Sequence, residues 1–283
     1  MADNTKSNFL SKEDYEEPRC PLCMDAADKD GVVVNRIDVG RMMSKLDEYL
    51  AYEDYDNAER LLKFWLTEAQ FGHDLQGELI IRNEMMGIYR KMQNKEKVIE
   101  NAKIGVEIAE KLQFQGTEIY GTTYLNAATG LYFAGMPEES IRFFEKAKEA
   151  YEKRLDKDDV KFAGLYNNMA LTLTELKRFD EALDYFNKSL KILPSVKNGK
   201  LDMASTYLNI ATLYEKKDGL ENAEKIIADN LDKAEECLND ESLIKDSYYY
   251  FVCDKCQSGF AYYGYFAFAD ELKKRVREYY ERA

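Results

Sequence analysis

The cysteines are the residues whose types and spacing most directly predict chemistry in this chain. Five occur among 283 residues, and four of them form two Cys-x-x-Cys pairs, Cys20 with Cys23 and Cys253 with Cys256. A random placement of five cysteines gives such a pair only roughly 0.07 times, so coincidence is a poor explanation. Four thiolates in two pairs match a closed tetrahedral zinc site. One interpretation is therefore a single structural zinc that both pairs share.

Two other interpretations of the pairs stay open. The thiols could be redox-active, or Cys253 and Cys256 could fill core positions of a helix as small apolar side chains. The pairs lie 230 positions apart, and the 13 residues from Cys23 to Arg36 reach at most about 45 Å. A shared site therefore needs a curved chain, a leader folded back across it, or a second protomer. The lone Cys237 is expected to pack.

Other catalytic chemistry has few candidate residues. The chain has one histidine, His73, so neither a histidine-based triad nor a multi-histidine metal centre can be built. No glycine-rich phosphate loop precedes a Lys-Ser or Lys-Thr pair. The acidic pair Glu138 and Glu139 is expected at a helix start, where carboxylates interact favourably with the helix dipole. We expect no enzymatic activity.

The elements that must position these residues repeat along the chain. Small or medium side chains recur at intervals of 40, 42, 42, 41 and 46 positions, at Ala58, Val98, Ser140, Ala182, Ala223 and Ala269. Between Tyr166 and Pro194, apolar residues fall at helical spacing on two consecutive segments, which predicts a helix-turn-helix hairpin. Six such units account for residues 36–283.

Within each unit a small side chain is expected to face a large one. The small residue of the first helix recurs as Ala128, Ala170 and Ala211, and the bulky residue of the second helix recurs as Leu62, Phe144, Phe186 and Ile227. This arrangement lets paired helices interlock. One hairpin cannot bury its apolar faces alone, so the copies are expected to stack into an all-α solenoid with a groove along one side.

The run NNMALTLTELKRFDEALDYFNKSLKILP at residues 167–194 resembles a tetratricopeptide repeat, including the terminal proline. The usual unit of that family has about 34 residues. The spacing of about 42 here is similar to the longer repeats of kinesin light chain and its bacterial relatives. The resemblance covers residues 36–283 and implies a right-handed α-α superhelical solenoid of about six hairpins. An acidic leader over residues 1–35, which carries the first cysteine pair, precedes it.

The resemblance also implies where a peptide would bind. In kinesin-light-chain-like repeats, asparagines at one position of the first helix hold cargo peptides. Here that position is Asn126, Asn168 and Asn209, with Asn167 and Asn83 beside it, and further groove positions are Thr129, Tyr132 and Thr212. An amide offers a donor and an acceptor, which an extended peptide backbone can match. The alternative is that these amides tie adjacent helices together or cap local backbone.

Composition and charge narrow the class of protein further. The chain is 45% hydrophobic and 33% charged, has four prolines, and contains no set of alternating strand segments, which favours a soluble all-helical fold. Its net charge of −13 repels nucleic-acid phosphates and anionic lipids, so we expect neither nucleic acid nor a membrane as a partner. No signal-peptide or membrane-spanning stretch is evident, so we expect a cytoplasmic location.

The last repeat is unusually rich in aromatic residues. Ten lie between positions 248 and 268: Tyr248, Tyr249, Tyr250, Phe251, Phe260, Tyr262, Tyr263, Tyr265, Phe266 and Phe268. Terminal repeats generally turn a polar face outward, so this ring surface suggests a cover. The cover would be the leader, a second subunit in a homodimer, or a partner. The alternative is that the rings fill the last core between helices.

These observations predict an interaction module in which the concave groove of the repeats holds an extended segment of a protein or peptide partner. The alternative function is a zinc- or redox-responsive regulator whose state is set by the two Cys-x-x-Cys pairs.

Overall fold

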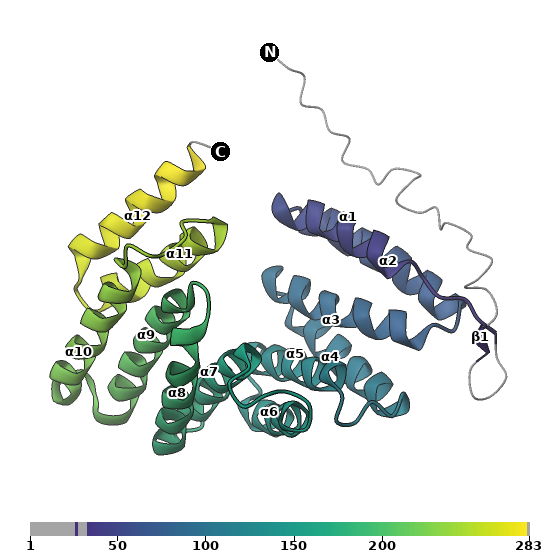
Figure 1. Cartoon of the computed structure of the whole chain (residues 1–283), viewed down its shortest axis with the longest axis horizontal. Helices are drawn as coiled ribbons and strands as arrows, with labels where there is room; N and C mark the ends of the chain where they lie inside the picture. Colours follow the sequence, from purple (N-terminus) through teal and green to yellow (C-terminus); the bar gives the residue numbers. More distant parts are fainter. Residues whose placement is uncertain (1–25, 28–32, 282–283) are drawn as a thin grey trace, which may run out of the picture. The chain divides into compact units, whose positions relative to one another are not determined.

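The computed structural model describes residues 26–27 and 33–281 of the chain (Figure 1). In that part the helices are α1 (Val39–Ala51), α2 (Tyr55–Phe71), α3 (Leu75–Lys91), α4 (Lys95–Lys111), α5 (Glu118–Ala134), α6 (Pro137–Glu152), α7 (Val160–Glu175), α8 (Phe179–Ile192), α9 (Gly199–Asp218), α10 (Leu220–Leu238), α11 (Ser247–Tyr262) and α12 (Phe266–Tyr280). A single 3-10 turn, Leu193–Ser195, follows α8. None of the described helices combines the length and apolar character that a membrane span requires.

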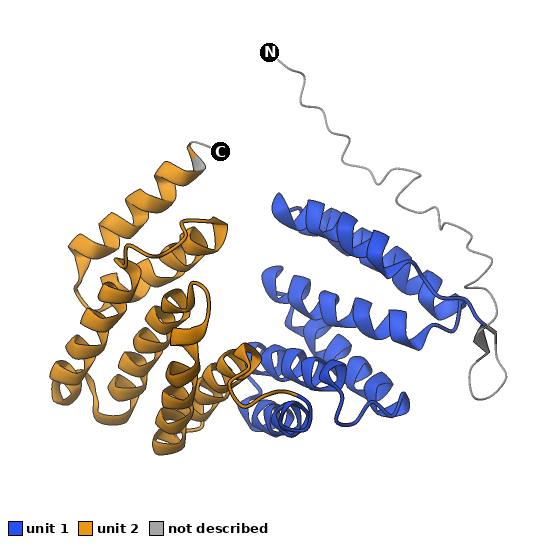
Figure 2. Cartoon of the chain, viewed as in Figure 1, with its two compact units in different colours: residues 1–154 blue, residues 155–283 orange. Residues whose placement is uncertain are grey.

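The helices pair in chain order into hairpins. The chain divides into two compact units, residues 1–154 and 155–283 (Figure 2). The first unit contains the hairpins α1–α2, α3–α4 and α5–α6, and the second contains α7–α8, α9–α10 and α11–α12. First helices of successive hairpins also contact each other, as α3 does with α5 and α9 does with α7 and α11. The predicted all-α class and its six stacked hairpins are confirmed.

One element departs from the strand-free expectation. The strands β1 (Ala26–Ala27) and β2 (Val33–Val34) pair antiparallel, with Ala26 opposite Val34 and Ala27 opposite Val33. Two residues per strand are too few to show the alternation by which a strand is recognised in a sequence.

The turns between the helices of the first unit follow a regular design. Asp54, Asp74 and Asn94 lie 20 positions apart, and each side chain accepts a hydrogen bond from the backbone N–H three residues later, which caps the next helix. The residue before each cap has positive φ; His73, at 56°, lies in one of these exposed turns. A left-handed residue followed by a cap ends one helix and starts the next within three residues.

The core confirms the predicted contacts between small and large side chains. All six recurring small residues of the second helices are buried, as are Ala128, Ala170 and Ala211 of the first helices. Ser140 shows why a small side chain is needed, because its hydroxyl donates a 2.8 Å hydrogen bond to the carbonyl of Ala128 on the paired helix. Ser189 makes the same kind of contact with the carbonyl of Ala163, at 2.9 Å.

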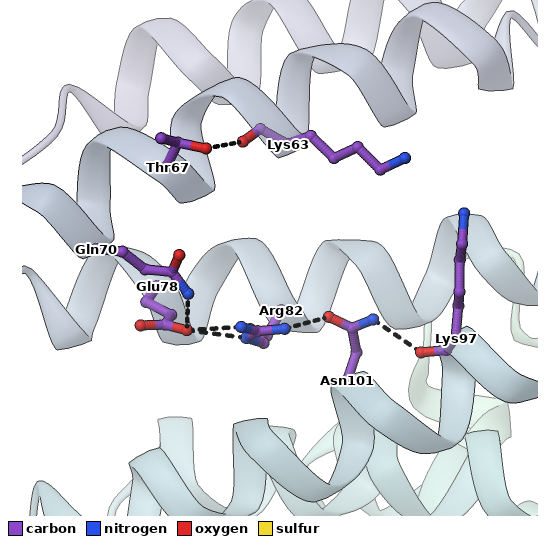
Figure 3. Close-up of polar contacts among 7 residues, drawn as sticks. All are labelled: Lys63, Thr67, Gln70, Glu78, Arg82, Lys97 and Asn101. Carbon is purple, nitrogen blue, oxygen red and sulfur yellow. Dashed lines mark hydrogen bonds and ion pairs between the residues drawn. The ribbon is translucent and has the colours of Figure 1, made fainter.

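A buried ion pair lies between α3 and its neighbours (Figure 3). Arg82 donates from Nη2 and Nε to Glu78 Oε1, at 2.8 and 3.1 Å, and from Nη1 to Asn101 Oδ1 on α4, at 3.0 Å. Gln70 on α2 donates to the same oxygen of Glu78 at 3.0 Å, and Asn101 donates to the carbonyl of Lys97 at 2.8 Å. The network thereby links three helices of the first unit through fully engaged polar groups.

Candidate peptide-binding site

In the first unit, two of the predicted asparagines bind each other across neighbouring first helices. Asn126 on α5 donates from Nδ2 to Asn83 Oδ1 on α3 at 2.9 Å. Asn83 in turn donates to Thr123 Oγ1 at 3.1 Å and to the carbonyl of Leu79 at 3.0 Å. Both amides are half-buried. The pair therefore ties α3 to α5.

The second unit repeats this arrangement. Asn209 on α9 donates to Asn167 Oδ1 on α7 at 3.2 Å, and Thr206 donates to the same oxygen at 3.3 Å. Asn–Thr–Asn bridges therefore occur twice, 39 to 43 positions apart along the chain. These contacts correspond to the helix-tying alternative drawn from the sequence, and they orient the amides rather than leaving them free to rotate.

The bridges leave part of the hydrogen-bonding capacity unused. Among the described residues, Asn126 Oδ1 and Asn209 Oδ1 accept no hydrogen bond, and the half-buried side-chain amide of Asn168 on α7 has no partner. An asparagine carbonyl oxygen has two lone pairs, so each of these oxygens can accept an N–H from another chain.

The remaining predicted groove residues lie on the same first helices. Thr129 and Thr212 donate their hydroxyls to the carbonyls four residues earlier, at 2.8 and 3.2 Å, which leaves the hydroxyl oxygen of Thr129 as an acceptor. Thr212 Oγ1 also accepts the hydroxyl of Tyr263 at 3.4 Å. Tyr132 is half-buried on α5. These side chains form a neutral polar lining.

An aromatic stripe on α11 completes the face of the second unit. Tyr248, Phe251, Lys255 and Tyr262 fall within an arc of about 60° on the helix, and the three rings are 42%, 49% and 68% exposed. Tyr248 donates its hydroxyl to Asp202 on α9 at 2.6 Å, and Tyr262 donates to Glu215 at 2.5 Å. These bonds place the stripe beside the α9 residues that include Asn209 and Thr212.

We call this surface the α9–α11 face: Asp202, Ser205, Asn209 and Thr212 with Tyr248, Phe251, Lys255 and Tyr262. Sequence reasoning named these aromatic residues only as the surface that a cover would hide. Their spacing of 3, 7 and 14 residues from Tyr248 was the signal that they share one side of the helix.

Carboxylates on α9 fix the hydroxyl ends of these rings. Glu215 accepts hydrogen bonds from Tyr262 and, at 2.6 Å, from Tyr263. Burial first, and then the Glu215 carboxylate, raises the pKa of Tyr263, while the hydrogen bond to Glu215 raises the pKa of Tyr262. Both hydroxyls therefore stay protonated and keep donating at neutral pH, so the exposed ring of Tyr262 is held in one orientation.

The second cysteine pair lies in the core. Cys253 and Cys256 are 0% and 2% exposed on α11, and Cys256 Sγ lies 3.9 Å from Ser205 Oγ. Burial raises the pKa of Cys253 and raises that of Cys256 to about 11, so both thiols are protonated at neutral pH. Cys20 and Cys23 lie outside the described residues. Over residues 26–27 and 33–281, no group of three or more His, Cys, Asp or Glu side chains could hold a metal ion.

The described part of the chain therefore favours the packing interpretation of Cys253 and Cys256 and gives the zinc interpretation no support. Cys237 on α10 is also buried, and burial raises the pKa of its thiol to about 11.

We expect the three buried thiols to react slowly with a disulfide reagent such as dithiobis(nitrobenzoic acid). At pH 8, a thiol with a pKa of about 11 holds roughly a hundredfold less thiolate than an exposed cysteine, and burial excludes the reagent. In a Cys20→Ser, Cys23→Ser background, the native protein should react more than about 100-fold more slowly than the same protein in guanidinium. Rapid reaction of the native form would contradict the buried placement.

Comparisons with known proteins agree with this geometry. A family model for tetratricopeptide repeats matches residues 119–195. No protein with curated annotation matches the sequence. The crystal structure of BtubC (BKLC) from P. vanneervenii is similar in fold, with a TM-score of 0.60 and 17% identity over 74% of this chain and 84% of that one.

A variant of the nearly identical TPR-like repeats of a predicted kinesin light chain from Podosopora anserina superposes with a TM-score of 0.50. Its identity is 14% over 72% of this chain and 97% of that one. At these identities the likeness concerns the fold. Residues 119–195 are therefore tetratricopeptide repeats, and the chain around them has the fold of kinesin-light-chain-like repeat proteins.

Proposed function

We propose that this chain is a protein-interaction module that holds an extended segment of a partner on the first helices of its repeats. Tetratricopeptide repeats serve generally in protein–protein interaction. The observation that carries the proposal is the α9–α11 face, where three exposed aromatic rings lie beside the unused acceptor of Asn209.

The chemistry of this face suits main chain together with apolar side chains. Asn209 Oδ1 can accept a backbone N–H, and the Asn168 amide can both donate and accept. The rings of Tyr248, Phe251 and Tyr262 supply apolar contact at a low entropic cost, because two of them are already oriented by carboxylates. In the first unit, Asn126 Oδ1 offers the same kind of acceptor.

A photo-crosslinking amino acid in place of Phe251 tests the proposal. We expect it to capture a partner in lysate and to mark one short segment of it, whereas the same amino acid in place of Phe266 should not. Phe266 is a matched control because it is also a phenylalanine of the second unit, is 66% exposed, and begins the second helix α12. Equal labelling from both positions would argue against the face.

The marked segment, made as a synthetic peptide, should then bind more weakly when Asn126, Asn168 and Asn209 are replaced by alanine. Loss of two neutral hydrogen bonds, at about 0.5–1.5 kcal/mol each, predicts a reduction in affinity of about tenfold. Fluorescence anisotropy measures the affinity, and circular dichroism checks that helicity is retained. An unchanged dissociation constant would remove the asparagines from the binding role.

Several finer predictions from the sequence remain predictions. They are a cytoplasmic location, the lack of enzymatic activity, the exclusion of nucleic acid and membranes, and a homodimer through the aromatic last repeat. Sedimentation equilibrium of the pure protein checks the homodimer, which predicts a mass near twice 32.9 kDa.

A further inference from the structure

A pocket of about 450 Å³ lies between α10 and the turn that joins α11 to α12, and it shares only Tyr262 with the α9–α11 face. Ile227 and Leu231 of α10 form an apolar floor, and both side chains are buried. Leu220, at the start of α10, lines the mouth and is 54% exposed. The volume is within the range of about 300–1,000 Å³ typical of ligand pockets.

Two tyrosines form preformed walls of this pocket. The hydroxyl of Tyr263 donates to Glu215 at 2.6 Å, and the hydroxyl of Tyr265 donates to Asp232 at 2.8 Å. Burial, followed by the hydrogen bond to Asp232, raises the pKa of Tyr265 to about 12, so this bond persists at neutral pH. Because both rings are anchored at their polar ends, a ligand would not have to order them, which reduces the entropic cost of binding.

The charged groups at the mouth are acidic. Glu221 and Glu224 are the charged residues of the lining, and within the described residues neither forms a hydrogen bond or ion pair through its side chain. Lys225, four positions after Glu221, is exposed and does not line the pocket.

The lysines that end α9 are already neutralised: Lys216 pairs with Glu175, and Lys217 pairs with Asp180 at 2.7 Å. The rim therefore attracts cations, in keeping with the net charge of −13.

We propose that this pocket binds a large apolar side chain of a partner protein where that side chain is flanked by lysine or arginine. An apolar anchor in a dry pocket surrounded by complementary rim charges is the usual anatomy of a binding hot spot. The contact is separate from the asparagine bridges, so a partner that lies on the α9–α11 face could engage it as a second point of attachment.

The test uses the full chain with labelled methyl groups and three capped tripeptides, Lys-Phe-Arg, Glu-Phe-Glu and Lys-Ser-Arg. We expect Lys-Phe-Arg to shift the NMR methyl signals of Ile227, Ala228 and Leu231, and we expect the other two peptides to bind at least about fivefold more weakly. Binding should also weaken as salt is added, because the rim charges are exposed.

Variants separate the two parts of the proposal. Ala228→Phe fills the pocket and should abolish the shifts. Glu221→Gln with Glu224→Gln should weaken Lys-Phe-Arg at least about fivefold, whereas the control Glu138→Gln with Glu139→Gln, an exposed acidic pair at the start of α6, should not. Equal binding of Glu-Phe-Glu, or equal loss in the control, would overturn the proposal. So would shifts of the same methyls on raising the protein concentration without peptide, because the occupant would then be a second copy.

Discussion

Replacing Arg82 by alanine is expected to lower the free energy of unfolding by about 3–5 kcal/mol, because the change leaves a carboxylate buried without its charge partner. The side chains of Arg82 and Glu78 are only 8% and 11% exposed. Arg82 supplies two of the hydrogen bonds to Glu78 Oε1, and Gln70 supplies a third. Asn101 Oδ1 on α4 would lose its donor as well. Urea unfolding followed by circular dichroism at several wavelengths measures the loss.

The double variant Glu78→Leu, Arg82→Met is the matched control. It removes both charges together and replaces them with apolar side chains of similar length, which is often neutral or stabilising for a buried pair. We therefore expect it to unfold close to the wild type. A second comparison is Lys188→Ala, which breaks an exposed pair with Asp184 on α8 and should cost under about 1 kcal/mol. Losses of similar size for Arg82→Ala and Lys188→Ala would show that the network contributes no more than a surface pair.

The hairpins could be predicted from the sequence because each one depends on local signals that recur. Ala182 and Phe186 lie one turn apart on the same helix, and their counterparts return at intervals near 42 positions. Both residues are buried as the spacing predicts. Such patterns need no knowledge of which helix lies opposite, because any apolar stripe must be covered by a neighbour.

The partners of the polar residues could not be predicted in the same way. The bond from Asn126 to Asn83, rather than to solvent or a ligand, depends on the register between α3 and α5 and on the side-chain rotamers. Neither leaves a mark in the sequence periodicity. The same is true of the link between Arg82 and Asn101, which joins two helices at positions where charge alone would predict exposure.

The cysteine pairs show the limit of an argument from chance. Cys253 and Cys256 are three positions apart on α11, and residues three apart share one face of a helix, so both side chains enter the same core. Helical packing therefore explains the spacing of this pair without a metal. The improbability of two such pairs carried weight only as long as the spacing had no other physical cause.

Asp74→Ala is expected to lower the free energy of unfolding of the first unit by about 2–4 kcal/mol. Asp74 is buried and has two roles: it caps α3 through the N–H of Gly77 at 3.0 Å and accepts the N–H of Ile37 at 3.1 Å. Loss of the cap costs about 0.5–2 kcal/mol. A buried backbone N–H left without an acceptor costs a further 1–3 kcal/mol or so.

Asp54→Ala separates these two roles. Asp54 caps α2 through the N–H of Asn57 at 3.2 Å but binds no residue outside its own helix start. We expect it to cost only about 1 kcal/mol. Asp74→Ser should fall between the two, because serine can still cap α3 but its single oxygen cannot also reach Ile37. If Asp74→Ala and Asp54→Ala cost the same, the bond to Ile37 contributes nothing to stability.

The bond to Ile37 also predicts where the change is felt. Ile37 belongs to a short segment before α1 that lies against the α2–α3 turn, since Asn35 donates its N–H to the carbonyl of Gly72 at 2.8 Å and Arg36 donates to Gln76 at 2.8 Å. Without Asp74, this segment loses its buried anchor while its two exposed bonds persist. Hydrogen exchange at the amides of residues 35–37 should therefore accelerate in Asp74→Ala and stay unchanged in Asp54→Ala, because only Asp74 connects the segment to a helix cap.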